Sequence, residues 1–333
     1  MDPATFKFLV FTVFNAATLV AGYVAFHRGW LSQAFSRRLH VFTVVVLWAA
    51  MSFLCVWSVP LSWSSLWLAV FPTVLIPVGV VSALGVGWML RLPRMSLAVA
   101  MVSAGLSNTG FTLGSYLCYC LLDDGEGAGA AALAMGVAMV TVMQVSAIAM
   151  LYPLASHFGT AEDRRDVWRR VLLSFWDVRA MPLYAGAAGL TLNVLGGSSV
   201  PMLAAPSGLL DTGWVQALIY AGAFGAMFGV GMNMHPWEAL RAWRDQVTLA
   251  VVKFAVFPLA TLGLLWLTML TWLPAEGLMA EMLWIEAFMP TGLIGVMIAN
   301  MFHLDARLSA NLWLVNTVAF LVVPLPVLIW VYG

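Results

Sequence analysis

The sequence predicts an all-α integral membrane protein with ten transmembrane helices in two inverted five-helix repeats. The first reason is composition, because 62% of the 333 residues are hydrophobic and only 9% are charged, whereas soluble domains carry about 25% charged residues. The second is a series of apolar segments that approach the roughly 20 residues a membrane-spanning helix needs. The third is an alternation of charge between successive loops. The net charge is zero, which leaves no general basic surface for nucleic acid.

Each of the ten predicted helices corresponds to one apolar segment of the sequence, and most of the loops between them are short. The sixth is the weakest, because "GAAGLTLNVLGGSSVP" is short and rich in glycine. The predicted spans are 5–26, 39–58, 66–88, 95–122, 130–155, 180–196, 213–234, 247–270, 281–302 and 309–331.

Basic residues orient these helices. Of the 15 Lys and Arg residues, only Lys7 and Lys253 fall outside alternate loops, and the intervening loops carry acidic residues such as Asp123, Asp211 and Glu276. Cytoplasmic loops are enriched in Lys and Arg. We therefore expect both termini on the non-cytoplasmic side. The basic residues of the alternate loops are Arg28, Arg37, Arg38, Arg91, Arg94, Arg164, Arg165, Arg169, Arg170, Arg179, Arg241, Arg244 and Arg307.

The longest predicted cytoplasmic connection, residues 156–179, divides the chain into a first repeat (1–155) and a second repeat (180–333). Its segment "EDRRDVWRRVLLSFWDVR" places aliphatic and aromatic residues on one helical face. This pattern favours a helix lying in the membrane interface, although a solvated linker is the alternative. Because five helices precede the linker, the second repeat begins on the opposite side of the membrane and is inverted, as in many secondary transporters.

Matching motifs interrupt the predicted fourth and ninth helices. "NTGFTLG" begins at Asn108 and "PTGLIGV" begins at Pro290, so the two Thr-Gly pairs are 182 residues apart. Pro77 and Pro258 of the third and eighth helices match at an offset of 181. Proline and glycine weaken a helix, and interrupted backbone in a membrane needs protein or a watery cavity around it. Close helix packing and a simple kink at Pro290 form the alternative interpretation.

These motifs supply the candidate substrate site. Free amides at the start of a half-helix favour an anion, so we expect backbone amides and short side chains to bind a carboxylate. Gln144 and Asn316, in the fifth and tenth helices, are further candidates, although interhelical hydrogen bonds are the more common role of such residues. The substrate-binding candidates of the motifs are Asn108, Thr109, Gly110, Pro290, Thr291 and Gly292.

Two charged residues within the spans are candidates for coupling or charge compensation. Lys253 could offset substrate charge or replace a cation, or it could extend its side chain to the nearby interface. Glu286 precedes Pro290 by four residues, on the same helical face. An intramembrane carboxylate is a functional candidate that could bind a proton. The alternative is a hydrated carboxylate near the outer interface.

No cofactor or metal is expected. Cys55, Cys118 and Cys120 lie in apolar runs and are interpreted as small buried hydrophobic residues. The five histidines are spread over four predicted loops, which disfavours a metal cluster.

Several stretches together resemble the auxin efflux carrier family of permeases in its shorter bacterial form. The first helix and loop ("AGYVAFHRGWLSQAFSRRLHVF"), "SNTGFTLG", "GAMFGVGMNM" and "VVKFAVFPLA" are similar to family segments, and the similarity is most specific in "MPTGLIGVMIANMFHLDARLSANLWLVNTVAFLVVPL". Plant members carry a proline at the fourth-helix crossover, where this chain has Asn108, and they contain a long central loop that is absent here.

The resemblance implies broken, crossing fourth and ninth helices at the substrate site. It implies a scaffold of the first, second, sixth and seventh helices, an elevator-like transport domain, and a possible homodimer through the scaffold. It also implies transport of a small organic anion, such as an auxin-like carboxylate or a dicarboxylate, across a bacterial inner membrane. The partners are then this anion and membrane lipid.

Two other classes stay open. One is a sodium- or proton-coupled symporter or antiporter of the bile-acid-symporter-like class, which usually places acidic residues in the crossover. Neither motif here contains one. The other is a polytopic membrane enzyme, for which the acidic stretches "DDGEG" and "AEDRRD" lack a histidine at metal-ligand spacing.

Overall fold

Every regular element in the described part of the chain is helical, and the only strand-like feature is one isolated bridge. Seven described helices are long and apolar enough to cross a membrane, as expected for an all-α integral membrane protein. Most of the predicted linker 156–179 lies outside the described residues, and with it most of the predicted interfacial helix. The computed structural model describes residues 3–110, 113–123, 127–159, 169, 172, 175–176, 178–198, 201–206, 208–235, 238 and 242–332.

The seven long helices correspond to the predicted first, second, third, fifth, seventh, eighth and tenth spans. The second and eighth each contain a π-helical segment, and the tenth is interrupted at Val323, before Pro324. Their elements are α1 (Pro3–His27), α2 (Gln33–Phe42) with η1 (Thr43–Trp48) and α3 (Ala49–Ser58), η2 (Trp63–Leu66) with α4 (Trp67–Met89), α7 (Ala128–Phe158), α10 (Gly213–Gly231), α12 (Trp243–Val251) with η7 (Val252–Val256) and α13 (Phe257–Met269), and α16 (Ala306–Val322) with α17 (Pro324–Tyr332).

The remaining predicted spans form shorter helices. The sixth, which the sequence marks as weakest, is α9 (Met181–Ser198). The fourth and ninth are each divided in two, as α5 (Arg94–Gly105) and α6 (Gly114–Leu121), and as α14 (Gly277–Ala287) and α15 (Leu293–Met301). Short 3₁₀ turns, η4 (Val178–Ala180), η5 (Pro201–Leu203) and η6 (Leu209–Asp211), flank α9 and α10.

The second span begins six residues before the predicted start at 39, because Ser32 caps α2. The Ser32 hydroxyl accepts a hydrogen bond from the amide of Phe35, which satisfies one of the free donors of the first turn. Arg38 therefore lies in the helix and not in the preceding loop. A long Arg side chain can extend from such a position toward the polar interface.

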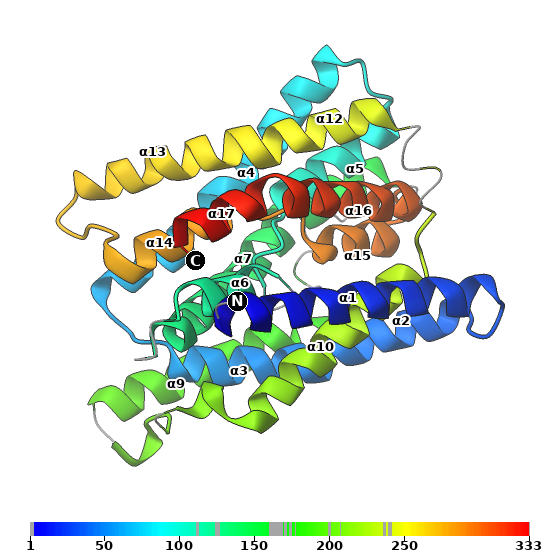
Figure 1. Cartoon of the computed structure of the whole chain (residues 1–333). Coiled ribbons are helices and arrows are strands. Elements are labelled where there is room, and N and C mark those ends of the chain that lie inside the picture. Colours follow the sequence, from blue (N-terminus) through cyan, green and yellow to red (C-terminus); the bar gives the residue numbers. More distant parts are fainter. Residues whose placement is uncertain are drawn as a thin grey trace.

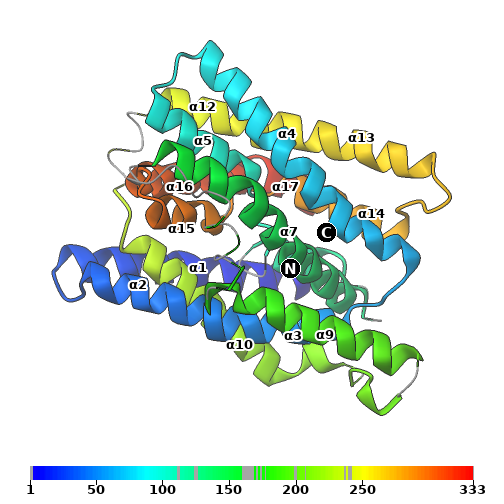
Figure 2. The ribbon, with the colours of Figure 1, turned by 180° about the vertical axis from the view of Figure 1, so that it is seen from behind.

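The helices form layers (Figure 1). On one side α1, α2, α3, α9 and α10 pack together, with contacts between α3 and α9 and between α1 and α10. On the opposite side lie α4, α12 and α13, and the view from behind shows the same arrangement (Figure 2). The divided helices lie between the two sides, where α7 contacts α3, α4, α5 and α6.

Burial distinguishes the divided helices from the long ones. Long helices expose large apolar side chains, such as Val13 of α1, Trp88 of α4 and Trp266 of α13, as expected for surfaces in lipid. In contrast, all eight residues of α6 are buried. Protein therefore surrounds the divided helices, which is the condition under which interrupted backbone is tolerated in a membrane.

The two termini lie at one end of the helix bundle (Figure 1). The connection between α1 and α2 and the first turns of α12 and α16 lie at the other end. These elements carry Arg28, Arg244 and Arg307. These three basic residues thus lie at the end of the bundle away from the termini.

Candidate functional site

Both interruptions expected from the sequence motifs are present. Helix α5 ends at Gly105 and α6 begins at Gly114, while α14 ends at Ala287 and α15 begins at Leu293. The four half-helices contain 12, 8, 11 and 9 residues, well short of the roughly 20 that cross a membrane. Each of the two predicted spans therefore consists of two half-helices and the non-helical segment that joins them.

The two interruptions pair with each other through their backbones. Ser107 and Thr291 form an isolated antiparallel bridge. The Asn108 amide donates to the Pro290 carbonyl at 2.7 Å, and the Gly292 amide donates to the Leu106 carbonyl at 3.0 Å. Groups that a continuous helix would satisfy internally are thus satisfied across the crossing point.

The first interruption forms without a proline because its own carbonyls cap the helix that follows. The Asn108 carbonyl accepts the Gly114 amide at 2.9 Å, and the Thr109 carbonyl accepts both the amide and the hydroxyl of Ser115. The Gly110 carbonyl also accepts the Ser115 amide. Asn108 therefore interrupts its helix as fully as Pro290 interrupts the other.

Gly292 permits the two segments to approach. A Cβ atom at this position would lie 2.8 Å from the Ser107 carbonyl oxygen and 3.2 Å from its carbon, and both are backbone atoms with little freedom to move. Gly110 has no such constraint, since its nearest neighbour would be Val140 Cγ2 at 4.0 Å. The two candidate glycines thus have different roles.

Asn316 is part of the crossover. Its buried side-chain oxygen accepts the Thr291 amide at 2.8 Å, and the Thr291 hydroxyl donates to the Ser103 carbonyl at 2.5 Å. Thr291 is therefore held from α16 on one side and from α5 on the other. This is the interhelical role that the sequence left as an alternative to substrate contact.

Lys253 does not extend to the interface. It lies in the π-helical segment η7 and is fully buried, with 0% exposure. Its ammonium group donates to Ser107 Oγ at 2.9 Å and lies 3.9 Å from the centre of the Phe257 ring. In its protonated form this side chain places a positive charge next to the crossover, which is favourable for an anionic ligand.

Glu286 is also buried, with 3% exposure, so it is not hydrated at the outer interface. It lines a cavity of about 30 Å³ together with Gly105, Ser107, Thr109 and Met143. Such a cavity has room for a water molecule. Both charged residues therefore lie near Ser107: Lys253 donates a hydrogen bond to its hydroxyl, and Glu286 lines the same cavity.

Gln144 lies apart from the paired backbones. It lines a second cavity, of about 60 Å³, with Val44 and Trp48 of η1, Tyr152 of α7 and Ile294 of α15. This cavity lies between η1, which joins α2 to α3, and the helices α7 and α15. The structure thus groups nine of the ten predicted site residues around the crossing point and places Gln144 at a neighbouring boundary.

Two residues that were not predicted from the sequence also take part in the crossover. Ser115 caps the start of α6, and Ser103 accepts the Thr291 hydroxyl through its carbonyl. Ser115 follows the first motif directly and could have been included with it. Ser103 lies within a helix, and its contact depends on packing that the sequence alone does not display.

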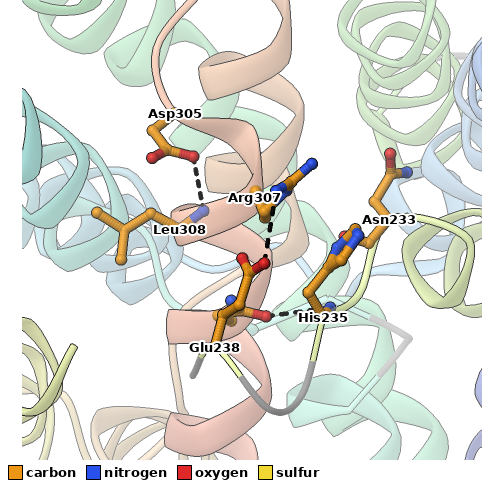
Figure 3. A network of polar contacts seen from close by, with 7 residues as sticks. Asn233, His235, Glu238, Asp305, Arg307 and Leu308 are labelled. Atoms are coloured by element: carbon orange, nitrogen blue, oxygen red, sulfur yellow. Dashed lines mark hydrogen bonds and ion pairs between the residues drawn. The ribbon is translucent and has the colours of Figure 1, made fainter. Parts of the chain in front are cut away.

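A second polar network lies where the chain passes from α10 to α12 (Figure 3). The Glu238 carboxylate pairs with Arg307 of α16 at 3.5 Å. The His235 amide donates to the Asn311 side chain at 3.3 Å. These contacts attach the connection to α16, but both members of the ion pair are about half exposed, so their energetic contribution is small.

In the described part of the chain, no three His, Cys, Asp or Glu side chains gather as metal ligands. A comparison with the models of known protein families gives no match, and a comparison with curated proteins gives none either. The function must therefore be inferred from the geometry of the crossover.

Proposed function

We propose that the protein is a secondary transporter that carries a small organic anion, such as an auxin-like carboxylate or a dicarboxylate, by alternating access. The observation that carries the proposal is the pairing of two interrupted helices inside the protein, with the buried Lys253 bonded to Ser107 at their crossing point. Interrupted helices of this kind form the substrate sites of many secondary transporters.

The chemistry of the crossover favours an anion. Lys253 provides a buried positive charge, and burial of a charge is costly unless an opposite charge or hydrogen bonds meet it. Ser107 and Thr109 add hydroxyl groups that can donate to a carboxylate. A carboxylate bound here would therefore meet one cation and short polar side chains in an environment that excludes bulk water.

The layers support an elevator-like movement. Helices α1, α2, α3, α9 and α10 include the spans that the family resemblance assigns to a scaffold, and they pack with one another. The cavity lined by Trp48 and Gln144 lies at the boundary between this layer and the divided helices. In the proposal, the protein has ten helices in two inverted repeats, and the divided helices move along this boundary relative to the scaffold. The scaffold helices of two copies form the homodimer.

A cation-coupled symporter is the second candidate, and the buried carboxylate of Glu286 is the observation that favours it. Sodium sites need several oxygen ligands, and Glu286, Ser107 and Thr109 line one cavity. The nearby ammonium group of Lys253 opposes a second cation. An anion permease is therefore the better supported of the two candidates.

The test is a thermal-shift screen of the purified protein with monocarboxylates and dicarboxylates at several pH values. A ligand that binds only the folded state at 100 times its Kd stabilises that state by about 2.7 kcal/mol. The corresponding uncharged amides are the controls. We expect one class of carboxylate to stabilise the protein and to be taken up by proteoliposomes, and a Lys253→Met variant to lose both effects. Equal stabilisation by acids and amides would contradict the proposal.

A further inference from the structure

The carboxylate of Glu286 is enclosed in the protein interior, beside the Ser115 hydroxyl. Both oxygens are inaccessible to solvent, and neither accepts a hydrogen bond from a described residue. The Ser115 hydroxyl lies in the same region but donates to the Thr109 carbonyl. An isolated buried carboxylate is very costly, so the negative charge must be met by a proton or by a cation.

Two glycines make room for this carboxylate. A Cβ atom at Gly114, the first residue of α6, would overlap Glu286 Oε2, and one at Gly136 of α7 would lie 3.3 Å from Oε1. The side chain is therefore directed at the N-terminal end of α6 and bounded by α7. It also lines the 30 Å³ cavity with Ser107 and Thr109, which provides a place from which water can reach it.

Few titratable groups surround Glu286. Helix α14 packs against α6, α7 and α13. Helix α6 brings Cys118 close enough to interact with the carboxylate. The same helix also carries Tyr116, Tyr119 and Cys120. Helix α13 contains no titratable residue, and α7 contains Tyr152 and His157, both in its last two turns. The remaining charge is that of Lys253, which reaches Ser107 from η7.

We propose that Glu286 is a proton-binding site that couples the proposed anion transport to protons. The carboxylate takes up one proton to become a neutral acid and releases the same proton when the cavity opens to water. When Glu286 is neutral, Lys253 is left as the charge that meets the substrate, so anion and proton bind together. The coupling rests on the proposed function, whereas the protonation of Glu286 can be tested without any substrate.

A proton fits the site better than a metal cation. The cavity of about 30 Å³ is small, and the ammonium group of Lys253 shares the Ser107 side chain that would be one of the metal ligands. A metal ion bound to Ser107 would therefore lie close to the Lys253 ammonium group, and two neighbouring cations repel each other strongly in a buried environment. A proton changes the charge of Glu286 without requiring further oxygen ligands.

Infrared difference spectroscopy of the purified protein during a pH titration tests the proposal. We expect a carbonyl band of a protonated acid that disappears as pH rises, that is absent from Glu286→Gln, and that sodium does not shift. Glu281→Gln is the matched control, because Glu281 is exposed on the same helix, and this variant should keep the band. Labelling the wild type with ¹³C-glutamate should displace the band, which keeps the test decisive if Glu286→Gln does not fold.

A band that persists in Glu286→Gln, or the complete lack of a titrating glutamic acid band in the labelled wild type, would overturn the proposal. A band whose titration moves with sodium concentration would also overturn it, in favour of a sodium site. Failure of the carboxylate screen with a normal Glu286 band would instead reject the anion-transport function and leave the proton site standing. The coupling of this proton to anion transport has its own test. The affinity for the anion should fall with rising pH in the wild type and stay constant in Glu286→Gln.

Discussion

Replacement of Gly292 by alanine tests whether the pairing of the two interruptions holds the crossover together. The new Cβ would lie 2.8 Å from the Ser107 carbonyl oxygen, so the two backbones must move apart. That movement weakens the hydrogen bonds from Asn108 to Pro290 and from Gly292 to Leu106, which measure 2.7 and 3.0 Å. Each such bond contributes about 0.5–1.5 kcal/mol. Loss of both therefore predicts a decrease of about 1–3 kcal/mol in the free energy of unfolding.

Equilibrium unfolding in mixed micelles with increasing SDS measures this change. Gly110→Ala is the matched control, because Gly110 lies in the opposite interruption and its new Cβ would find Val140 at 4.0 Å. Such a change should alter the free energy of unfolding by less than about 0.5 kcal/mol. If Gly292→Ala and Gly110→Ala gave the same free energy, the close approach at Gly292 would not be needed for stability and the reasoning would be refuted.

Three further predictions concern the buried polar groups. Lys253→Met removes a buried charge and keeps a side chain of similar length, so the free energy of unfolding should stay unchanged or rise. Anion uptake by proteoliposomes should fall at least about tenfold, because a charge-assisted contact with the anion is lost. Asn316→Leu should cost about 1–3 kcal/mol in SDS unfolding, because the Thr291 amide loses its acceptor; Asn316→Asp, which keeps an acceptor oxygen, should cost less, and equal losses would contradict this role. Glu286→Gln should flatten the pH profile of uptake, which in the wild type should decline as pH rises and the carboxylate loses its proton; identical profiles would argue against a role for this proton.

The interruptions themselves were predictable from the sequence. Thr-Gly pairs 182 residues apart follow residues that weaken helices, and such local preferences act wherever the segment lies. The consequence for Asn108 was harder to foresee, since asparagine does not prevent a helix. Its interruption is maintained by the hydrogen bond from its amide to the Pro290 carbonyl and by capping of α6. The first of these contacts exists only when the two segments meet.

The positions of the charged groups were less predictable. Lys253 is close enough to the end of its predicted span to reach the interface, yet it bends inward to Ser107 from a π-helical segment. Glu286 could equally have been hydrated, but Gly114 and Gly136 make space for it in the interior. Helical periodicity shows which residues share a face, but it does not show which partner that face will meet.

The sequence by itself determined the membrane-protein composition, the series of apolar segments, the alternation of basic loops and the two places where helices are interrupted. These properties follow from the hydrophobicity, charge and backbone freedom of individual residues. Only the tertiary structure decided that the interruptions pair, that Asn316 holds Thr291, and that Lys253 and Glu286 are both enclosed near Ser107. The physical reason is that burial and hydrogen bonding depend on partners elsewhere in the chain, 25 residues away for Asn316 and Thr291 and 146 residues away for Lys253 and Ser107. Helix packing brings those partners together.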